Sequence, residues 1–337
     1  MSKIAIVGEF WTKAEEEAGG SFSPSSSTGR LLRGLLTQAG INPSDCFFTH
    51  LFRTQANDIK QFCTDRHNKL DNYPPVVSGK YIDGSHRSEL LRLHNELNRE
   101  APNVIVASGT AALWALCGRG KSKPISAKSF RGAPIRSDLG YKVIPTYSIS
   151  GLFRDWSNRP VVLSDLAKAL TESTFPEVRR PVREIWVNPT FEDLELFKTH
   201  YIDPSPDLSI DIETLDKYIT SIAFAPREDV SLVIPLIRKS LTPYWPNPQT
   251  ELAVWNFIKT LCGLKKNIIG QNFMFDMHRL WRTYGVPVPH AQNDTMLLHH
   301  SLYIELEKGL GFLGSVYTTE ARWKGRRKHE SMKKEDE

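Results

Sequence analysis

Two acidic residues separated by one apolar residue could hold a metal ion in this chain. They are Asp211 and Glu213, and a third acid, Asp276, follows further along the sequence. Side chains alternate along a strand, so Asp211 and Glu213 are expected on the same face. Neighbouring carboxylates repel unless a cation lies between them, and Mg²⁺ and Mn²⁺ prefer oxygen ligands. With Asp276, they would form a cradle for two metal ions about 4 Å apart, an arrangement that cleaves phosphodiester bonds.

The elements that must position these acids follow from hydrophobic patterning. The acids lie at the end of a short apolar strand and on a later helix, within a region predicted to form a mixed sheet with helices. The expected strands are 185–187, 208–212, 219–225, 230–235 and 267–270, and the expected helices are 250–261 and 275–284.

The first half of the chain alternates strands and helices. This pattern predicts a three-layer α/β unit with a mostly parallel sheet. The expected strands are 4–7, 46–52, 104–107 and 141–145, and the expected helices are 28–39, 89–99, 109–116 and 159–170. The polar run at 21–29, Ser-Phe-Ser-Pro-Ser-Ser-Ser-Thr-Gly, is expected to be a flexible loop.

A boundary is expected where the periodicity stops. Residues 173–183 contain two prolines and a cluster of charges. We therefore predict two α/β domains, residues 1–172 and residues 184–337, joined by this linker.

The amino-acid composition limits the kinds of binding partner and the cellular compartment that we expect. The 337 residues carry a formal net charge of +5, with basic residues concentrated in the last segment, so a phosphate-rich partner is possible. The four cysteines show no Cys-x-x-Cys spacing, which argues against a zinc site, an iron–sulfur site or a disulfide scaffold. No apolar stretch reaches the roughly 18 residues of a membrane span. We expect no membrane partner and a reducing, cytoplasmic setting.

Three motifs near the acids occur in a recognisable order. Asp-Ile-Glu-Thr at 211–214, Asn-Phe-Met-Phe-Asp at 272–276 and Asp-Thr-Met at 294–296 follow one another. Together they resemble the 3′–5′ exonuclease domain of family A DNA polymerases, which has a ribonuclease-H-like fold. Asp294 itself is interpreted as the N-cap of a helix that opens at Thr295.

The resemblance implies roles for individual residues. Asp211 and Glu213 would hold the metal that activates water, and Asp276 would hold the second metal, with Mg²⁺ or Mn²⁺ as the ions. Thr214, Asn272 and Phe275 would contact the substrate, and the last two would also position the helix that carries Asp276.

One expected motif of that family is missing. A Tyr-x-x-x-Asp sequence normally supplies another acid, but here Tyr317 is followed four residues later by Ala321. The chain stops at Glu337, about where that helix should start. The chain is a fragment, the product of a split gene, or a protein with an incomplete site.

The N-terminal half resembles another family. Gly8-Glu9, the later Gly-Gly-Ser-Phe and Thr-Gly-Arg-Leu-Leu runs, and the segment around Ser148 follow the order seen in bacterial family 4-like uracil-DNA glycosylases, over roughly residues 1–170. The family's Pro-Gly turn after Gly-Glu is absent, and so are its iron–sulfur cysteines. Thr49-His50-Leu51 stands where the family has a base-reading asparagine.

The most consequential departure is Ser148, which stands in place of the family's catalytic-loop histidine. Base excision needs stabilisation of negative charge on a flipped base, and a serine cannot supply an imidazolium. The glycosylase-like site of Gly8, Glu9, His50 and Ser148 is therefore predicted to be inactive. The open alternatives are a domain that binds DNA or senses uracil without cutting, residual glycosylase activity, and a purely structural module.

Basic side chains near this site are candidate phosphate contacts. The best cluster is the basic loop 118–131, with Lys128 and Arg131, and Arg154 is a further candidate. Lys121, Lys123 and Arg159 complete the set.

The order of the two halves is similar to the amino-terminal portion of family A DNA polymerases from large bacteriophages. The resemblance implies a 3′–5′ exonuclease that proofreads during DNA replication, acts on a single-stranded DNA 3′ end and works with a polymerase domain or chain in the host cytoplasm. The alternatives are a non-catalytic DNA-binding subunit of a split polymerase and an active uracil-DNA glycosylase.

Overall fold

The computed structural model describes residues 3–320, and the basic C-terminal segment lies outside the described residues. The chain divides into two compact units. Unit 1 comprises the chain up to Arg179 together with the segment that begins at Gly309, and unit 2 runs from Arg180 to Lys308. Within the described residues, no helix is long and apolar enough to cross a membrane.

Unit 1 is built on a five-stranded sheet. Its strand order is β2-β1-β5-β7-β6, in which the first four strands are parallel and β6 is antiparallel. The strands are β1 (Ile4–Trp11), β2 (Cys46–Gln55), β5 (Val104–Ser108), β6 (Ile135–Arg136) and β7 (Lys142–Thr146). The expected mostly parallel sheet is confirmed.

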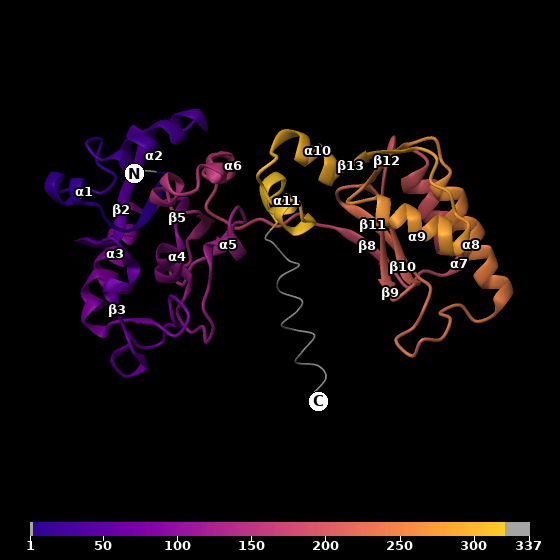
Figure 1. Cartoon of the computed structure of the whole chain (residues 1–337), viewed down its shortest axis with the longest axis horizontal. Helices are drawn as coiled ribbons and strands as arrows, with labels where there is room; N and C mark the ends of the chain where they lie inside the picture. Colours follow the sequence, from indigo (N-terminus) through magenta and orange to yellow (C-terminus); the bar gives the residue numbers. More distant parts are fainter. Residues whose placement is uncertain (1–2, 321–337) are drawn as a thin grey trace. The chain divides into compact units, whose positions relative to one another are not determined.

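Helices cover both faces of this sheet (Figure 1). Along β1, Ile4 and Ile6 pack into one core cluster and Ala5 and Val7 into another, because successive side chains point to opposite faces. The first cluster is completed by α2 (Ser27–Gln38) and α6 (Arg159–Glu172), and the second by α3 (Arg87–Glu100) and α4 (Thr110–Cys117). The predicted three-layer arrangement, with helices on both faces of a sheet, is confirmed.

Unit 1 also contains short elements that hydrophobic patterning did not predict. They are α1 (Lys13–Ala18), β3 (Cys63–Thr64), β4 (Tyr81–Ile82) and α5 (Ala127–Phe130). The run at 21–29, expected to be a flexible loop, is instead ordered at its end. Ser26 is buried and caps α2 by accepting a hydrogen bond from the Gly29 N–H at 2.9 Å.

Unit 2 contains a six-stranded mixed sheet with the order β13-β12-β9-β10-β11-β8. Strands β9, β10 and β11 form an antiparallel meander, β12 runs parallel to β9, and β13 runs parallel to β12. The strands are β8 (Glu184–Val187), β9 (Asp207–Leu215), β10 (Tyr218–Arg227), β11 (Val230–Pro235), β12 (Asn267–Gly270) and β13 (Ala291–Asp294). This arrangement agrees with the expected ribonuclease-H-like fold.

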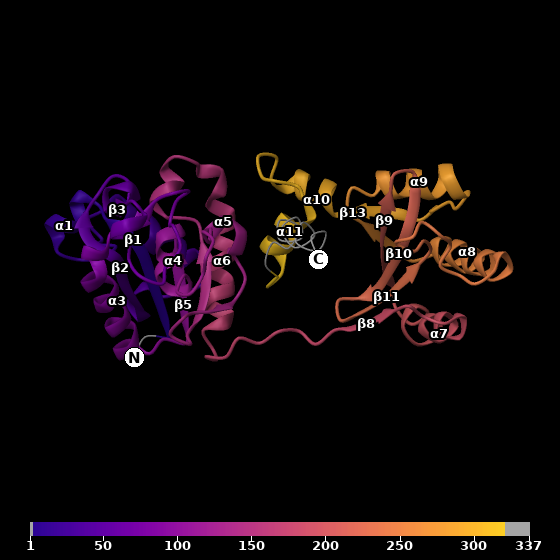
Figure 2. The ribbon, with the colours of Figure 1, turned by 90° about the horizontal axis from the view of Figure 1, so that it is seen from below.

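The helices of unit 2 bury the apolar face of this sheet. Figure 2 shows α7 (Phe191–Phe197) and α8 (Pro248–Cys262) beside the meander, and their buried side chains join one core with α9 (Met274–Tyr284). The chain then forms β13 and α10 (Thr295–Leu302). Asp294 accepts a hydrogen bond from the Met296 N–H at 2.9 Å, so the predicted N-cap is confirmed.

The last described helix, α11 (Leu310–Tyr317), belongs to unit 1. This differs from the expectation that the second domain would run from 184 to 337. The reason is a buried polar contact with unit 1. Arg131 donates to Asp165 at 2.7 and 3.2 Å and to the Ser315 hydroxyl at 2.7 Å, and Ser164 donates to the Val316 carbonyl at 2.8 Å.

The same contact corrects the interpretation of Arg131 as a phosphate contact. Its side chain is 1% exposed and its guanidinium forms an ion pair with Asp165, which is also buried. A buried arginine that is already paired is not available to DNA.

We predict that Arg131→Met destabilises unit 1 by about 3–5 kcal/mol, because it leaves the Asp165 carboxylate buried without its cation. Urea denaturation followed by circular dichroism would measure the loss. Arg99→Met is the control, because Arg99 is a largely exposed partner of Glu100 and should cost less than about 1 kcal/mol. Equal midpoints for the two variants would contradict the assignment.

Candidate functional site

The four glycosylase-like residues predicted from the sequence line one cavity of unit 1. Gly8, Glu9, His50 and Ser148 surround a space of about 40 Å³. Gly8 and Glu9 lie toward the end of β1, His50 lies on β2, and Ser148 follows β7. The cavity therefore lies at the carboxyl ends of parallel strands, where ligands bind in open α/β sheets.

Glu9 is fixed at the start of α4. Its carboxylate accepts a hydrogen bond from the Ala111 N–H at 2.9 Å, a position that the helix dipole favours for an anion. Gly109 has a φ of +101°, and a Cβ there would lie 2.4 Å from the Glu9 carboxyl carbon. Burial raises the pKa of Glu9, although the Ala111 N–H, Ser148 and Arg154 act in the opposite direction.

His50 fills much of the space beside Glu9. Its side chain is 3% exposed and its ring stacks on Phe22, with centroids 4.2 Å apart and an interplanar angle of 29°. Burial, together with the charges of Arg92 and Arg53, lowers the pKa of His50 to about 3. The imidazole is therefore neutral, so its 3.9 Å approach to Glu15 is not an ion pair.

Phe22 and Glu15 also line the cavity, and neither was predicted from the sequence as a site residue. Phe22 lies in the left-handed region, with a φ of +49°, and its N–H donates to the Glu15 carboxylate at 2.6 Å. Phe22 was noted only as part of the Gly-Gly-Ser-Phe run. Glu15 lies in a run of three glutamates, and its position three residues after Thr12, the spacing of a capping box, is the signal that distinguishes it.

The remaining basic candidates of unit 1 are exposed. Arg154 and Lys128 lie at the surface, and so do Lys121 and Lys123 in the loop before α5. Arg154 is close enough to influence the charge of Glu9. These side chains, unlike Arg131, have the exposure that a phosphate contact requires.

In unit 2, strand β9 presents the predicted acid pair. Asp211 and Glu213 are exposed, while Ile212 between them is buried, so both acids lie on the same face. Their partners on β10 are Ala223 and Ser221.

The third acid, Asp276, is anchored between the members of this pair. Its carboxylate accepts a hydrogen bond from the backbone N–H of Ile212 at 3.0 Å. Asp276 is buried, and its pKa is raised to about 6, first by burial and then by the negative charges of Asp211 and Asp294. The helix acid and the strand acids are therefore neighbours.

The other predicted residues of unit 2 lie around the start of α9. Asn272 is exposed with a φ of +53°, and its carbonyl accepts from the Phe275 N–H at 3.1 Å. Phe275 is 44% exposed, with Arg279 over its ring, and Thr214 is half-buried on β9. Asp294 holds this turn by accepting from the Asn272 and Phe273 N–H groups at 3.0 and 2.8 Å.

The acids do not form a complete metal-binding group. Across residues 3–320, no three His, Cys, Asp or Glu side chains are arranged to hold a metal ion. The metal set of Asp211, Glu213 and Asp276 therefore stays a prediction.

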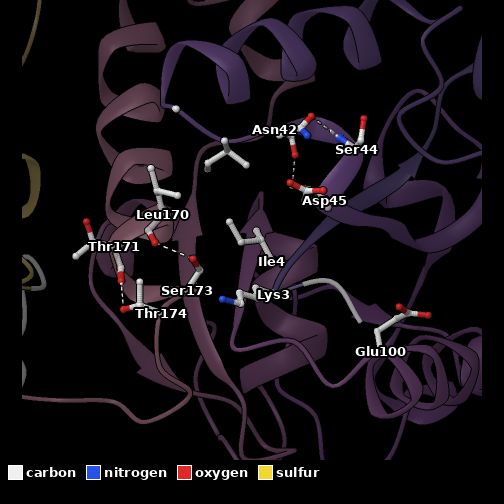
Figure 3. A pocket seen from close by; sticks show the side chains of 13 residues that line it. Lys3, Ile4, Asn42, Ser44, Asp45, Glu100, Leu170, Thr171, Ser173 and Thr174 are labelled. Atoms are coloured by element: carbon white, nitrogen blue, oxygen red, sulfur yellow. Dashed lines mark hydrogen bonds between the residues drawn. The ribbon is translucent and has the colours of Figure 1, made fainter.

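Another hollow of unit 1, about 910 Å³, contains none of the predicted residues (Figure 3). It includes Ile4 and Cys46, the first residues of β1 and β2, so it lies at the opposite end of the sheet from the Glu9 cavity. Its polar side chains bond locally. Ser44 donates its N–H to Asn42, and Ser173 donates its hydroxyl to the Leu170 carbonyl. These polar groups are therefore used in local hydrogen bonds and do not point to a ligand site in this hollow.

Unit 1 thus has a mostly parallel sheet covered on both faces, with a cavity lined by Glu9 and Glu15 at the strand ends. Residues 1–171 match the uracil DNA glycosylase superfamily. Over 170 residues the chain is 30% identical to a type-4 uracil-DNA glycosylase of Thermotoga maritima, covering 50% of this chain and 76% of that protein. The chain belongs to the uracil-DNA glycosylase superfamily.

Distant structural neighbours include an exonuclease domain. The EXD2 exonuclease domain soaked in Mn and GMP has 16% identity and a TM-score of 0.26, over 36% of this chain and 59% of that chain. The same domain soaked in Mg and dGMP has 14% identity and a TM-score of 0.28, over 38% and 64%. The chain therefore spans less than two thirds of these neighbours, and scores this low do not establish a shared activity.

We predict that Asp276→Asn stabilises the protein at pH 8 by about 1–3 kcal/mol. The folded-state pKa is raised from 3.8 to about 6, so the stability that Asp276 contributes is present below pH 3.8 and lost as pH rises through 6. Asparagine retains an oxygen that can accept from Ile212. Urea midpoints at several pH values, in the absence of divalent ions, would measure the gain.

The control for this measurement is Asp216→Asn, since Asp216 is exposed in the turn after β9. The gain for Asp276→Asn should shrink toward zero near pH 4. A gain that does not change with pH would refute the ionised, buried carboxylate as its cause.

Proposed function

We propose that this chain is a 3′–5′ exonuclease module that proofreads DNA, joined to a glycosylase-fold unit that holds DNA without excising bases. In this proposal, unit 2 acts on a single-stranded 3′ end and unit 1 contacts the phosphate backbone. The chain would correspond to the amino-terminal part of a bacteriophage family A DNA polymerase, with a polymerase domain or a separate polymerase chain as its partner.

The observation that carries the proposal is the acidic edge of unit 2. Asp211 and Glu213 share one exposed face of β9, and the Asp276 carboxylate lies against the backbone between them. Buried acids beside exposed ones are costly for stability, and such clusters occur where function requires them. Mg²⁺ or Mn²⁺ bound there would offset the repulsion and supply Lewis-acid chemistry for phosphodiester cleavage.

The proposed substrate contacts lie along the same acidic edge of unit 2. Phe275 presents a partly exposed ring next to Asp276, and an aromatic face can stack on a terminal base. Thr214 follows Glu213 on β9, and Asn272 shapes the turn that begins α9. These three residues are proposed to seat the terminal nucleotide.

In this proposal the site is incomplete. The sequence contains no Tyr-x-x-x-Asp motif, and no three His, Cys, Asp or Glu side chains within the described residues are arranged to hold a metal ion. This observation favours the second candidate, a DNA-binding subunit of a split polymerase whose site is completed by its partner. An active uracil-DNA glycosylase is the third candidate, and Ser148 argues against it because a hydroxyl cannot carry the positive charge that excision requires.

We predict that the isolated chain trims single-stranded DNA weakly with Mn²⁺. Each missing ligand loosens the metal and misplaces the attacking water. Asp211→Ala should remove the remaining trimming and leave DNA binding nearly unchanged, while Asp216→Ala should do neither. Gel analysis of 5′-labelled oligonucleotides would measure trimming, and filter binding would measure affinity.

A partner chain that begins with a Tyr-x-x-x-Asp helix should restore Mn²⁺-dependent trimming. Robust digestion by the isolated chain, abolished by Asp211→Ala, would instead show a self-sufficient exonuclease. Trimming that survives Asp211→Ala would exclude this acidic edge as the active site.

We predict that alanine at Lys121, Lys123 and Lys128 weakens DNA binding for all sequences alike. Phosphate contacts release counterions, so the slope of log affinity against log salt should fall by about 2 when three contacts to a single strand are lost. Fluorescence anisotropy across a salt series would measure this slope.

The control variant carries alanine at Lys13, Lys60 and Lys80, which removes the same charge from other exposed positions of unit 1. An equal loss in both variants would show that net charge, not this loop, controls binding.

A further inference from the structure

The cavity of unit 1 already contains a flat aromatic ring, and that ring belongs to the protein. The His50 imidazole lies over Phe22 with centroids 4.2 Å apart, in a stacked geometry. Enzymes that act on a flipped base hold it by stacking it against aromatic or apolar side chains. His50 therefore occupies the kind of position on Phe22 that a flipped base would take.

The imidazole leaves little free space in the cavity. With His50 in place, the centre of a water-sized sphere can reach only about 40 Å³ of it. A pyrimidine ring with its exocyclic oxygens is several times larger than a water molecule. The wall behind His50 is also closed, since a Cβ on Gly8 would lie 2.3 Å from the His50 ring.

The stacking platform is held rigidly. The buried Glu15 carboxylate accepts from the Phe22 N–H at 2.6 Å and also caps α1 through Thr12. The Phe22 carbonyl lies 2.5 Å from where a Cβ on Gly29 would be, so only glycine fits there. A non-glycine residue at positive φ costs free energy and persists when its surroundings hold it in place. These contacts preserve an aromatic face whose partner is His50.

The hydrogen bonding of the His50 ring is incomplete, which is unusual for a buried residue that serves packing alone. Its Nδ1 is buried and has no hydrogen-bond partner among the described residues. Buried polar atoms are nearly always paired, and an unpaired one reduces stability. The charged groups near the ring are the carboxylate of Glu15 and the guanidinium groups of Arg53 and Arg92. The ring is neutral, as a nucleobase would be.

We propose that His50 is an internal substitute for a flipped base, which closes a nucleobase site that the fold of unit 1 still builds. The wild-type unit would then bind DNA without taking up a base, and removing the imidazole would reopen the site to a small planar heterocycle such as imidazole or uracil. This inference rests on the fold of unit 1 and does not involve the acids of unit 2, so its failure leaves the exonuclease proposal untouched.

The test is His50→Gly in the full chain, with free imidazole and free uracil as probes. Calorimetry and the midpoint of thermal unfolding should show binding of both probes to the variant, with uracil bound at least about tenfold more tightly than by the wild type. His86→Gly is the matched control. His86 also packs on aromatic rings, with centroids 5.3 Å from Phe52 and 5.4 Å from Phe62, but it does not line the cavity.

A second substitution tests whether the Phe22 ring is the surface on which uracil stacks. Adding Phe22→Leu to His50→Gly should abolish uracil binding while the protein still unfolds cooperatively. If His50→Gly does not fold, His50→Ser prepared with imidazole present takes its place, and imidazole should raise its unfolding midpoint.

Three results would overturn the proposal. One is tight uracil binding by the wild-type chain, which would mean that His50 does not close the site. Another is a folded His50→Gly or His50→Ser variant that binds neither probe at millimolar concentration. The third is uracil binding that is unaffected by Phe22→Leu.

Discussion

The hydrogen bond from the Ile212 N–H to the Asp276 carboxylate determines how unit 2 presents its acids. It joins β9, which carries Asp211 and Glu213, to the first turn of α9. Because Asp276 is held against the strand, it is buried and lies beside Asp211, and burial together with that neighbouring charge raises its pKa to about 6. The fold thus maintains a concentration of negative charge at one edge of the sheet, and the proposed metal chemistry depends on it.

In our proposal, both units contain side chains placed to position a ligand, and each lacks one group that the chemistry needs. In unit 1 the Phe22 platform and the anchored Glu9 remain, but Ser148 cannot act as an imidazolium and His50 fills the cavity. In unit 2 the acid pair and the Asp276 anchor are present, and no three His, Cys, Asp or Glu side chains among the described residues are arranged to hold a metal ion. This combination supports the second candidate of our proposal, a chain that holds DNA for a partner.

The sequence predicted the features that depend on local pattern. The buried runs of β1 and β5, the alternation that places Asp211 and Glu213 on one face, and the N-cap Asp294 each follow from a few neighbouring residues. The placement of α11 does not, because it depends on Arg131 and Ser315, which are far apart in sequence. For the same reason Arg131 looked like part of an exposed basic loop. Its burial is caused by Asp165, and the spacing within the loop carries no sign of that partner.

The most direct test of the acidic edge is a crystal structure of the chain with Mn²⁺ and a short single-stranded DNA, with anomalous scattering used to locate the metal. The account predicts a manganese peak about 2–2.5 Å from carboxylate oxygens of Asp211 and Asp276, with the DNA 3′ end beside Phe275. A manganese peak bound only elsewhere, or a DNA 3′ end seated away from β9 in a structure with full metal occupancy, would contradict it.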